Sequence, residues 1–172
     1  MDFYKVIQER ESIRNYDPNR PIEKETLLRI IEAGRIAPSA ANLQPWKFIL
    51  VSSKDKLKKI QACYPRSWFC DAPHILIVKG NRKMAWKRPH DGYNSLETDL
   101  TIAMDHMILA AENEGLGTCW IANFNPDILR DALKLTADEF VFAITPLGYQ
   151  KKDFNKKSAK QRKPLDEVLE II

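Results

Sequence analysis

The stretch "SLETDLTIAMDHMILAAENEGLGTCWIANF", residues 95–124, joins a long helical pattern to an extended segment. Its apolar residues step by four and three, the spacing of one face of an α-helix, at Leu96, Leu100, Ala103, Met107 and Ala110. Gly115 and Gly117 are typical of a helix end, and "TCWIANF" after them predicts a strand or extended stretch. We therefore expect a helix from about 95 to 115, followed by an extended segment.

Further elements lie on both sides of this stretch. Helical patterns occupy residues 3–10, 23–36, 54–63, 125–135 and 164–172. Strand-like apolar runs lie at 46–53, 73–80 and 139–149. In the second helix the apolar face is expected to comprise Leu27, Leu28, Ile31 and Ile36. Helices and strands alternate loosely, so the chain is predicted to be a single α+β domain over 1–172, with a small mixed sheet covered by helices.

Composition argues against several classes of protein. The 172 residues are 44% hydrophobic and 29% charged, an ordinary globular balance, and no apolar run approaches the roughly 20 residues of a membrane span. No secretory signal is visible and the three cysteines form no CxxC pair, which favours a reduced compartment and a cytoplasmic location. No ligand-spaced His/Cys cluster and no glycine-rich nucleotide-binding motif occurs, so neither a metal site nor a Rossmann or P-loop site is expected.

Two segments carry cations in pairs. In "RESIR", residues 10–14, an extended chain would place Arg10, Ser12 and Arg14 on one face, where guanidinium groups and a hydroxyl suit a phosphate. In the basic segment 151–163, Lys160 and Arg162 repeat this spacing. Taken alone, a charged helix end and a solvated tail explain the two segments as well. Nucleic-acid binding is a weaker interpretation, because no aromatic stacking pattern accompanies the tail.

Two further segments could approach a flat ligand. In "APSAANLQPW", residues 37–46, small residues leave the backbone accessible, and the amides of Asn42 and Gln44 offer donors and acceptors. In "GLGTCWIANF", residues 115–124, two glycines let backbone N–H groups face a ligand. The alternatives are a turn before a strand and a helix cap before a core strand. Cys119 has apolar neighbours and is interpreted as a packed strand residue rather than a redox thiol.

Together these segments resemble the FMN-dependent nitroreductase family. The resemblance runs over nearly the whole chain, in the order "RESIRNY", "APSAANLQPWKFILV", "GLGTCWIANF", "PLGY" and a K-x-R pair. It implies a nitroreductase-like fold with a mainly antiparallel sheet flanked by helices, in an intertwined homodimer that holds FMN at its interface. The helix from about 95 to 115 would be the central dimer helix, which would account for its apolar stripe.

The resemblance also implies which residues bind the cofactor. The FMN phosphate and ribityl end would be held by Arg10, Glu11, Ser12, Arg14, Lys160 and Arg162. The partner subunit would line the flavin through Pro38, Ser39, Ala40, Asn42 and Gln44. The isoalloxazine would lie along Ile121, Ala122 and Asn123, with a backbone N–H near flavin N5. No catalytic side chain and no metal are expected.

Two departures from the family pattern bear on the chemistry. Some relatives carry Glu-Gly where this chain has Ala122 and Asn123, so a carboxylate near the nicotinamide is absent here. Some relatives also carry an Asn and a Lys that reach the flavin pyrimidine edge. The corresponding stretch "CYPRSWFCDAP" has no matching pair, so three alternatives stay open: Arg66 takes that role, Trp68 takes it, or no residue does.

The function implied by the resemblance is an FMN-dependent oxidoreductase. Electrons from NADH or NADPH would pass through flavin N5 to nitroaromatics, quinones or similar small acceptors in a ping-pong cycle. Two alternatives stay open: a flavoprotein of the same fold with another redox reaction, such as a dehydrogenase or dehalogenase, and a non-catalytic flavin- or nucleic-acid-binding module. Neither a nucleic-acid partner nor a membrane partner is expected.

Overall fold

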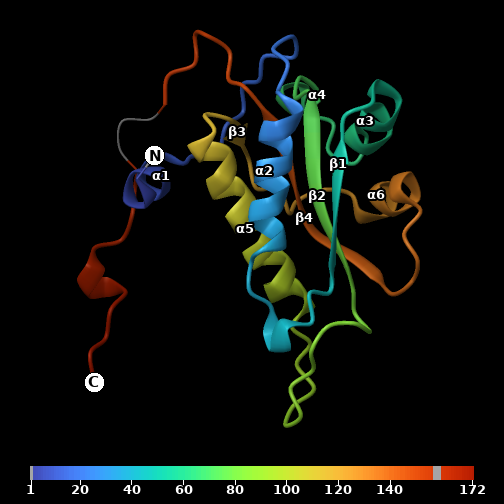
Figure 1. Cartoon of the computed structure of the whole chain (residues 1–172), viewed down its shortest axis with the longest axis vertical. Helices are drawn as coiled ribbons and strands as arrows, with labels where there is room; N and C mark the ends of the chain where they lie inside the picture. The colour runs from blue at the N-terminus through green and yellow to red at the C-terminus, as the bar shows by residue number, and fades with distance from the viewer. Residues whose placement is uncertain (1, 157–159) are drawn as a thin grey trace.

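A computed structural model of the chain describes residues 2–156 and 160–172 (Figure 1). Its first half contains the helices α1 (Phe3–Glu9), α2 (Lys24–Arg35), α3 (Lys54–Gln61) and α4 (Ser67–Cys70), the 3-10 turn η1 (Ala40–Asn42), and the strands β1 (Trp46–Val51) and β2 (His74–Asn81). Its second half contains α5 (Leu96–Asn113), β3 (Gly117–Thr118), α6 (Pro126–Leu133), β4 (Glu139–Gly148) and the 3-10 turn η2 (Leu165–Glu167). The predicted helices and strands are present in this order, except at the C-terminus.

The four strands form one sheet in the order β1–β2–β4–β3, and each neighbouring pair is antiparallel. The two central strands, β2 and β4, are almost entirely buried, as their continuous apolar sequences require. A parallel bridge from Ser12 to Thr118 attaches the N-terminal segment beside β3. The prediction of an α+β fold with a mixed, mainly antiparallel sheet is confirmed.

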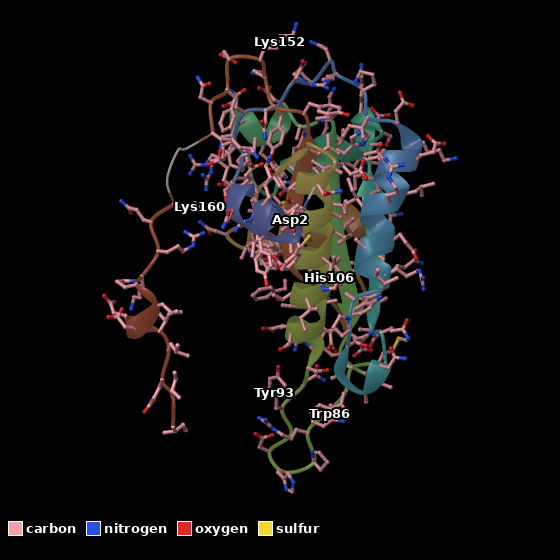
Figure 2. All side chains as sticks on the ribbon, turned by 60° about the vertical axis from the view of Figure 1, so that its left-hand side comes forward. Asp2, Trp86, Tyr93, His106, Lys152 and Lys160 are labelled. Atoms are coloured by element: carbon pink, nitrogen blue, oxygen red, sulfur yellow. The ribbon has the colours of Figure 1, made fainter. Side chains whose placement is uncertain are left out.

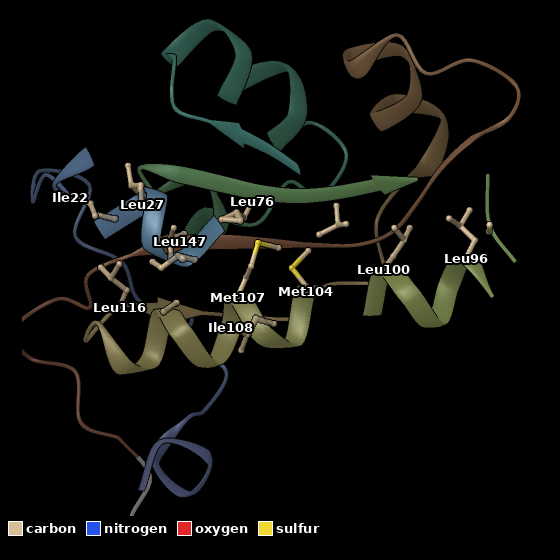
Figure 3. Close-up of a cluster of buried hydrophobic side chains, with 14 residues drawn as sticks. Ile22, Leu27, Leu76, Leu96, Leu100, Met104, Met107, Ile108, Leu116 and Leu147 are labelled. Carbon is tan, nitrogen blue, oxygen red and sulfur yellow. The ribbon is translucent and has the colours of Figure 1, made fainter. Parts of the chain in front are cut away.

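Helices cover both faces of this sheet (Figure 1). On one face, Met104 and Met107 of α5 pack against Leu76 of β2 and Leu147 of β4 in the core (Figure 3). On the other face, α3 and α6 cover a second cluster. The apolar stripe of α5 is therefore buried against its own chain. The core of a single chain therefore accounts for this stripe, and the role of α5 as the central dimer helix stays a prediction.

The face that α2 buries also differs from the prediction. Leu27 and Ile30 are buried, but Leu28 and Ile36 are 53% and 64% exposed. Gly34 completes the buried face, because a Cβ there would lie 2.7 Å from the Met107 side chain. The approach of α5 at this glycine fixes the rotation of α2, which a count of apolar residues alone does not reveal.

The start of α6 follows the sequence signal closely. The Asn125 side chain accepts hydrogen bonds from the backbone N–H groups of Asp127 and Ile128, at 3.0 and 3.2 Å. Pro126 occupies the first turn, where its missing N–H leaves no bond unmade. The predicted cap is confirmed.

The C-terminal segment departs most from the prediction. A helix over 164–172 is expected from its pattern, but only the turn η2 forms there, and the segment extends away from the body (Figure 1). Leu165, Val168 and Ile171 are 71%, 62% and 87% exposed. A short helix is marginal in water unless it packs, and no other part of the described chain covers this segment. The residues 160–172 are called the C-terminal arm below.

Candidate functional site

Residues 10–14 leave α1 as an extended segment that runs beside β3. The Ile13 N–H donates to the Thr118 carbonyl at 2.8 Å, and the Ile13 side chain is fully buried. Gly117 permits this approach, because a Cβ there would lie 2.8 Å from the Ile13 side chain. Side chains alternate along an extended chain, so Ser12 and Arg14 point outward while Ile13 points inward.

A cavity of about 470 Å³ opens over this segment. Its lining consists of Arg10, Glu11, Ser12, Arg14, Lys160, Gln161 and Arg162. The structure therefore brings the two predicted cation pairs together from opposite ends of the sequence. Gln161 was not predicted, and only its position between the two cations could have indicated it. Residues 157–159 of the basic segment lie outside the described residues.

Two lysines hold the C-terminal segment against the body. The Lys160 Nζ donates to the Ile7 carbonyl at 3.0 Å. The Lys156 Nζ forms an ion pair with Glu112 in the last turns of α5, and it also donates to the Glu9 carbonyl at 3.3 Å. Because Glu112 is buried, this pair fixes where the chain enters the cavity.

The cavity has a surplus of positive charge. Four cations and one carboxylate line it. Partial burial lowers the pKa of Lys160, and the neighbouring cations Arg10 and Arg162 lower it further. A bound dianion would relieve this repulsion, and Ser12 adds a hydroxyl donor. The donor set therefore fits a phosphate group.

The chain continues from β3 along residues 119–123. Ile121 is buried and exchanges two backbone hydrogen bonds with Ile144, at 3.0 and 2.9 Å. Ala122 and Asn123 are exposed, and within the described residues their N–H groups make no hydrogen bond. These two N–H groups are the ones available to a ligand. Cys119 is buried, and burial raises the pKa of its thiol, which agrees with a packing role.

The loop 37–46 has an unusual backbone. Ala41, Asn42 and Gln44 have φ angles of 50°, 55° and 49°, in a left-handed region that residues other than glycine seldom adopt. The Gln44 N–H donates to the Ser39 hydroxyl at 3.0 Å, and the Gln44 side-chain amide donates to the Asn42 carbonyl at 3.2 Å. Residues 41–44 are nevertheless exposed. Pro38 is exposed as well, and Ser39 and Ala40 are partly buried.

The loop and the cationic cavity lie at opposite ends of α5. The loop is attached at the first turn, where the Ala40 N–H donates to Asp99, and the C-terminal segment is attached near the last turn at Glu112. The helix rises 1.5 Å per residue, so these two attachments are about 20 Å apart. Figure 1 shows the loop at the lower end of α2 and α5, and Figure 2 shows Lys160 near the upper end. One chain therefore does not bring its own loop to its own cavity.

A second loop projects from the same end as residues 37–46. It spans 82–95 and carries Trp86 and Tyr93 on its two sides, before the tip (Figure 2). An ion pair between Arg88 and Asp91 and a bridge between Lys87 and Asn94 give it internal order.

The structure separates the two candidates for the flavin pyrimidine edge. The Arg14 guanidinium lies over the Trp68 ring, 5.8 Å from its centroid. The Arg66 guanidinium instead lies 6.0 Å from the Tyr64 ring. Trp68 therefore contacts a residue that lines the cationic cavity, and it makes edge-to-face contacts with Tyr64 and Phe69. Within the described residues no cluster of His, Cys, Asp or Glu could hold a metal ion.

Comparison with known proteins identifies the family. The model of the Nitroreductase family matches residues 7–65 and 61–149, which include the segment 10–14, the loop 37–46 and the strand after α5. The chain belongs to the nitroreductase family. Proteins of this family are oxidoreductases, so this nitroreductase is an enzyme.

Three relatives illustrate how far the similarity extends. An Archaeoglobus fulgidus protein named "Putative NADH dehydrogenase/NAD(P)H nitroreductase" is 33% identical over 157 residues, 87% of either chain. The crystal structure of a nitroreductase family protein from Clostridium difficile 630 superposes with a TM-score of 0.89 at 34% identity, over 99% of this chain and 98% of that one. An FMN-dependent nitroreductase from Clostridium difficile R20291 superposes with a TM-score of 0.74 at 27% identity, over 89% of this chain and 90% of that one.

None of the helices in residues 2–156 and 160–172 is long and apolar enough to span a bilayer.

Proposed function

We propose that this nitroreductase is an FMN-dependent oxidoreductase that takes electrons from NADH or NADPH and passes them to nitroaromatics, quinones or similar small acceptors. The observation that carries the proposal is the cationic cavity over residues 10–14. It is assembled from both ends of the chain, and its donor set suits a phosphate dianion. The FMN-dependent nitroreductase from Clostridium difficile R20291 supports the choice of cofactor.

The chain's own residues would bind and orient the flavin. Arg10, Arg14, Lys160 and Arg162 would hold the phosphate, and the Ser12 hydroxyl would donate to it. The unbonded N–H groups of Ala122 and Asn123 would face the ring edge. FMN supplies the electron-transfer chemistry when it is bound. Neither residue 122 nor residue 123 is an acid or base, so the protein would contribute hydrogen bonds there, from the two backbone N–H groups and the Asn123 amide.

A homodimer would complete this site. The loop 37–46 lies about 20 Å from its own cavity and leaves Asn42 and Gln44 exposed, so a second copy of the chain would have to supply it. Apolar side chains that a second copy could cover are exposed on α1, α2 and the C-terminal arm, namely Phe3, Tyr4, Leu28, Ile36, Leu165, Val168 and Leu169. The interface of a stable dimer is rich in such residues.

The first experiment is a titration of the purified protein with FMN. We expect a yellow protein that releases FMN on denaturation, sediments as a dimer, and oxidises NADH or NADPH when a nitroaromatic or a quinone is present. A colourless protein that also fails to bind added FMN would overturn the proposal. Turnover of a halogenated phenol, without turnover of the nitroaromatic or quinone, would favour the dehalogenase alternative.

A pair of matched variants tests the role of the arm. Lys160→Ala with Arg162→Ala removes two cations of the cavity. We expect FMN affinity to fall by at least about 100-fold, since hydrogen bonds to charged groups contribute about 1.5–3 kcal/mol each. Lys163→Ala removes a neighbouring exposed cation outside the cavity and should leave FMN affinity unchanged. If the tail serves nucleic acid instead, the double variant will lose a salt-dependent oligonucleotide shift and keep its flavin.

A further inference from the structure

The carboxylate of Asp99 is buried at the beginning of α5 and binds the loop 37–46. Only 2% of the residue is exposed. One carboxylate oxygen accepts the Ala40 N–H at 2.9 Å, and the other accepts the Ser95 hydroxyl at 2.7 Å. Within the described residues no cation pairs with it. Its position in the first turn of α5 supplies the compensating positive potential, because the N-terminus of a helix stabilises an anion.

The loop is fixed at both ends and strained between them. The Ala40 N–H is tied to Asp99, and the Pro45 carbonyl accepts the Asn81 N–H at 3.1 Å. Between these anchors lie the three left-handed residues, two of which, Ala41 and Gln44, are residue types that avoid this conformation. Strained backbone persists only where surrounding contacts determine it, and it gathers at functional sites. Residues 41–44 are exposed, so the strained conformation depends mainly on the hydrogen bonds at Ala40 and Pro45.

We propose that Asp99 is a positioning residue for cofactor binding. Its carboxylate holds the loop in the strained shape that presents Asn42 and Gln44 to the flavin of the partner subunit. The proposal rests on the proposed function, since it assigns the loop to the second half of that site. It differs from a simple helix cap in one respect: the bond from Ala40 joins α5 to a segment distant in the sequence.

Two variants separate the hydrogen bonds from the charge. Asp99→Ala removes both acceptors and frees the loop. Asp99→Asn keeps the shape, because the amide oxygen can still accept the Ala40 N–H while the amide nitrogen donates to the Ser95 hydroxyl. Asp55→Asn is the matched control, since Asp55 lies in the first turn of α3, is exposed and does not contact the loop. Met104→Ala controls for lost stability, because it removes a core side chain of α5 and leaves both hydrogen bonds of Asp99 in place.

The experiment measures FMN affinity and, in the cofactor-free protein, backbone hydrogen exchange over residues 37–46. We expect Asp99→Ala to weaken FMN binding by about 10- to 100-fold and to accelerate exchange in this loop. Asp99→Asn should lose less than about fivefold. Asp55→Asn and Met104→Ala should keep the exchange rate of the loop and most of the FMN affinity, whatever they do to the unfolding midpoint.

Four results would overturn the proposal. Unchanged exchange in Asp99→Ala would show that Asp99 does not fix the loop. Faster exchange with unchanged FMN affinity would show that it fixes the loop without serving the cofactor. If Met104→Ala lost as much FMN affinity as Asp99→Ala, the effect would be a general loss of stability. A wild-type chain that bound no FMN would overturn the proposed function and, with it, the cofactor role of Asp99. This outcome is distinguishable from the others because the wild-type protein itself fails the FMN titration.

Discussion

Replacement of Lys156 by methionine would test how the cationic cavity is held together. Glu112 is buried near the end of α5, where only 5% of its side chain is exposed and the helix dipole disfavours an anion. Removal of one partner from a buried ion pair costs about 3–5 kcal/mol, because the remaining charge stays buried. The Lys156 side chain is 34% exposed, so water can reach the pair, and we expect the lower figure of about 2–3 kcal/mol. That is a large share of the about 5–15 kcal/mol that stabilises a domain.

The assay is urea unfolding of four proteins: wild type, Lys156→Met, Glu112→Gln and the double variant. We expect Lys156→Met to lower the free energy of unfolding strongly in wild type, but by less than about 1 kcal/mol once Glu112→Gln has removed the buried charge. Lys152→Met, at an exposed position nearby, is the control and should cost less than about 0.5 kcal/mol. An equal loss of unfolding free energy from Lys156→Met in wild type and in Glu112→Gln would show that the buried charge of Glu112 is not the cause. FMN affinity of Lys156→Met should also fall, because the segment that precedes Lys160 loses its anchor.

Three further predictions concern glycine contacts and pH. Gly80→Ala should destabilise the protein by about 1–3 kcal/mol in urea unfolding, because the new Cβ would lie 2.8 Å from the Pro45 carbonyl oxygen, and it should also weaken FMN binding through the loop. Burial lowers the pKa of His74, so near neutral pH the unfolded chain binds more protons than the folded one. The free energy of unfolding is therefore highest above the ordinary histidine pKa of 6.5 and falls as the pH drops below it. His74→Asn should make the free energy of unfolding depend less on pH in urea unfolding curves between pH 7 and 5. The lowered pKa of Lys160 predicts that FMN affinity falls as the pH rises toward 10, because the cation loses its proton earlier than an exposed lysine does, and titrations of Lys160→Met should show a weaker pH dependence.

Much of the fold could be predicted from local patterns, because the contacts that shape it repeat along the sequence. The stripe of α5 and the Asn125 cap of α6 are examples, since spacing and capping chemistry are local properties. The orientation of α2 was not predictable in this way, because it depends on how closely Met107 approaches Gly34. The prediction of a terminal helix over 164–172 was wrong for a related reason. The apolar pattern is present, but no part of the described chain covers it.

The candidate site was predicted in parts rather than as an arrangement. The alternation of residues 10–14 follows from strand geometry, and the structure confirms it. The meeting of Lys160 with Arg10 depends on tertiary contacts. Beforehand, only the equal spacing of the two cation pairs and the family resemblance connected these segments. The positions of Trp68 beside Arg14 and of Glu112 beneath Lys156 have no periodic signal, since each is a single contact between distant segments.

The separation of loop and cavity along α5 has a genetic consequence. In a symmetric dimer each site would take its cavity from one chain and its loop from the other. An allele with a defective cavity, such as Arg14→Ala, still encodes a sound loop, and an allele with a defective loop still encodes a sound cavity. Mixed dimers of the two products would contain one site built entirely from native residues. Two inactive alleles expressed together should therefore complement each other and restore roughly a quarter of the active sites.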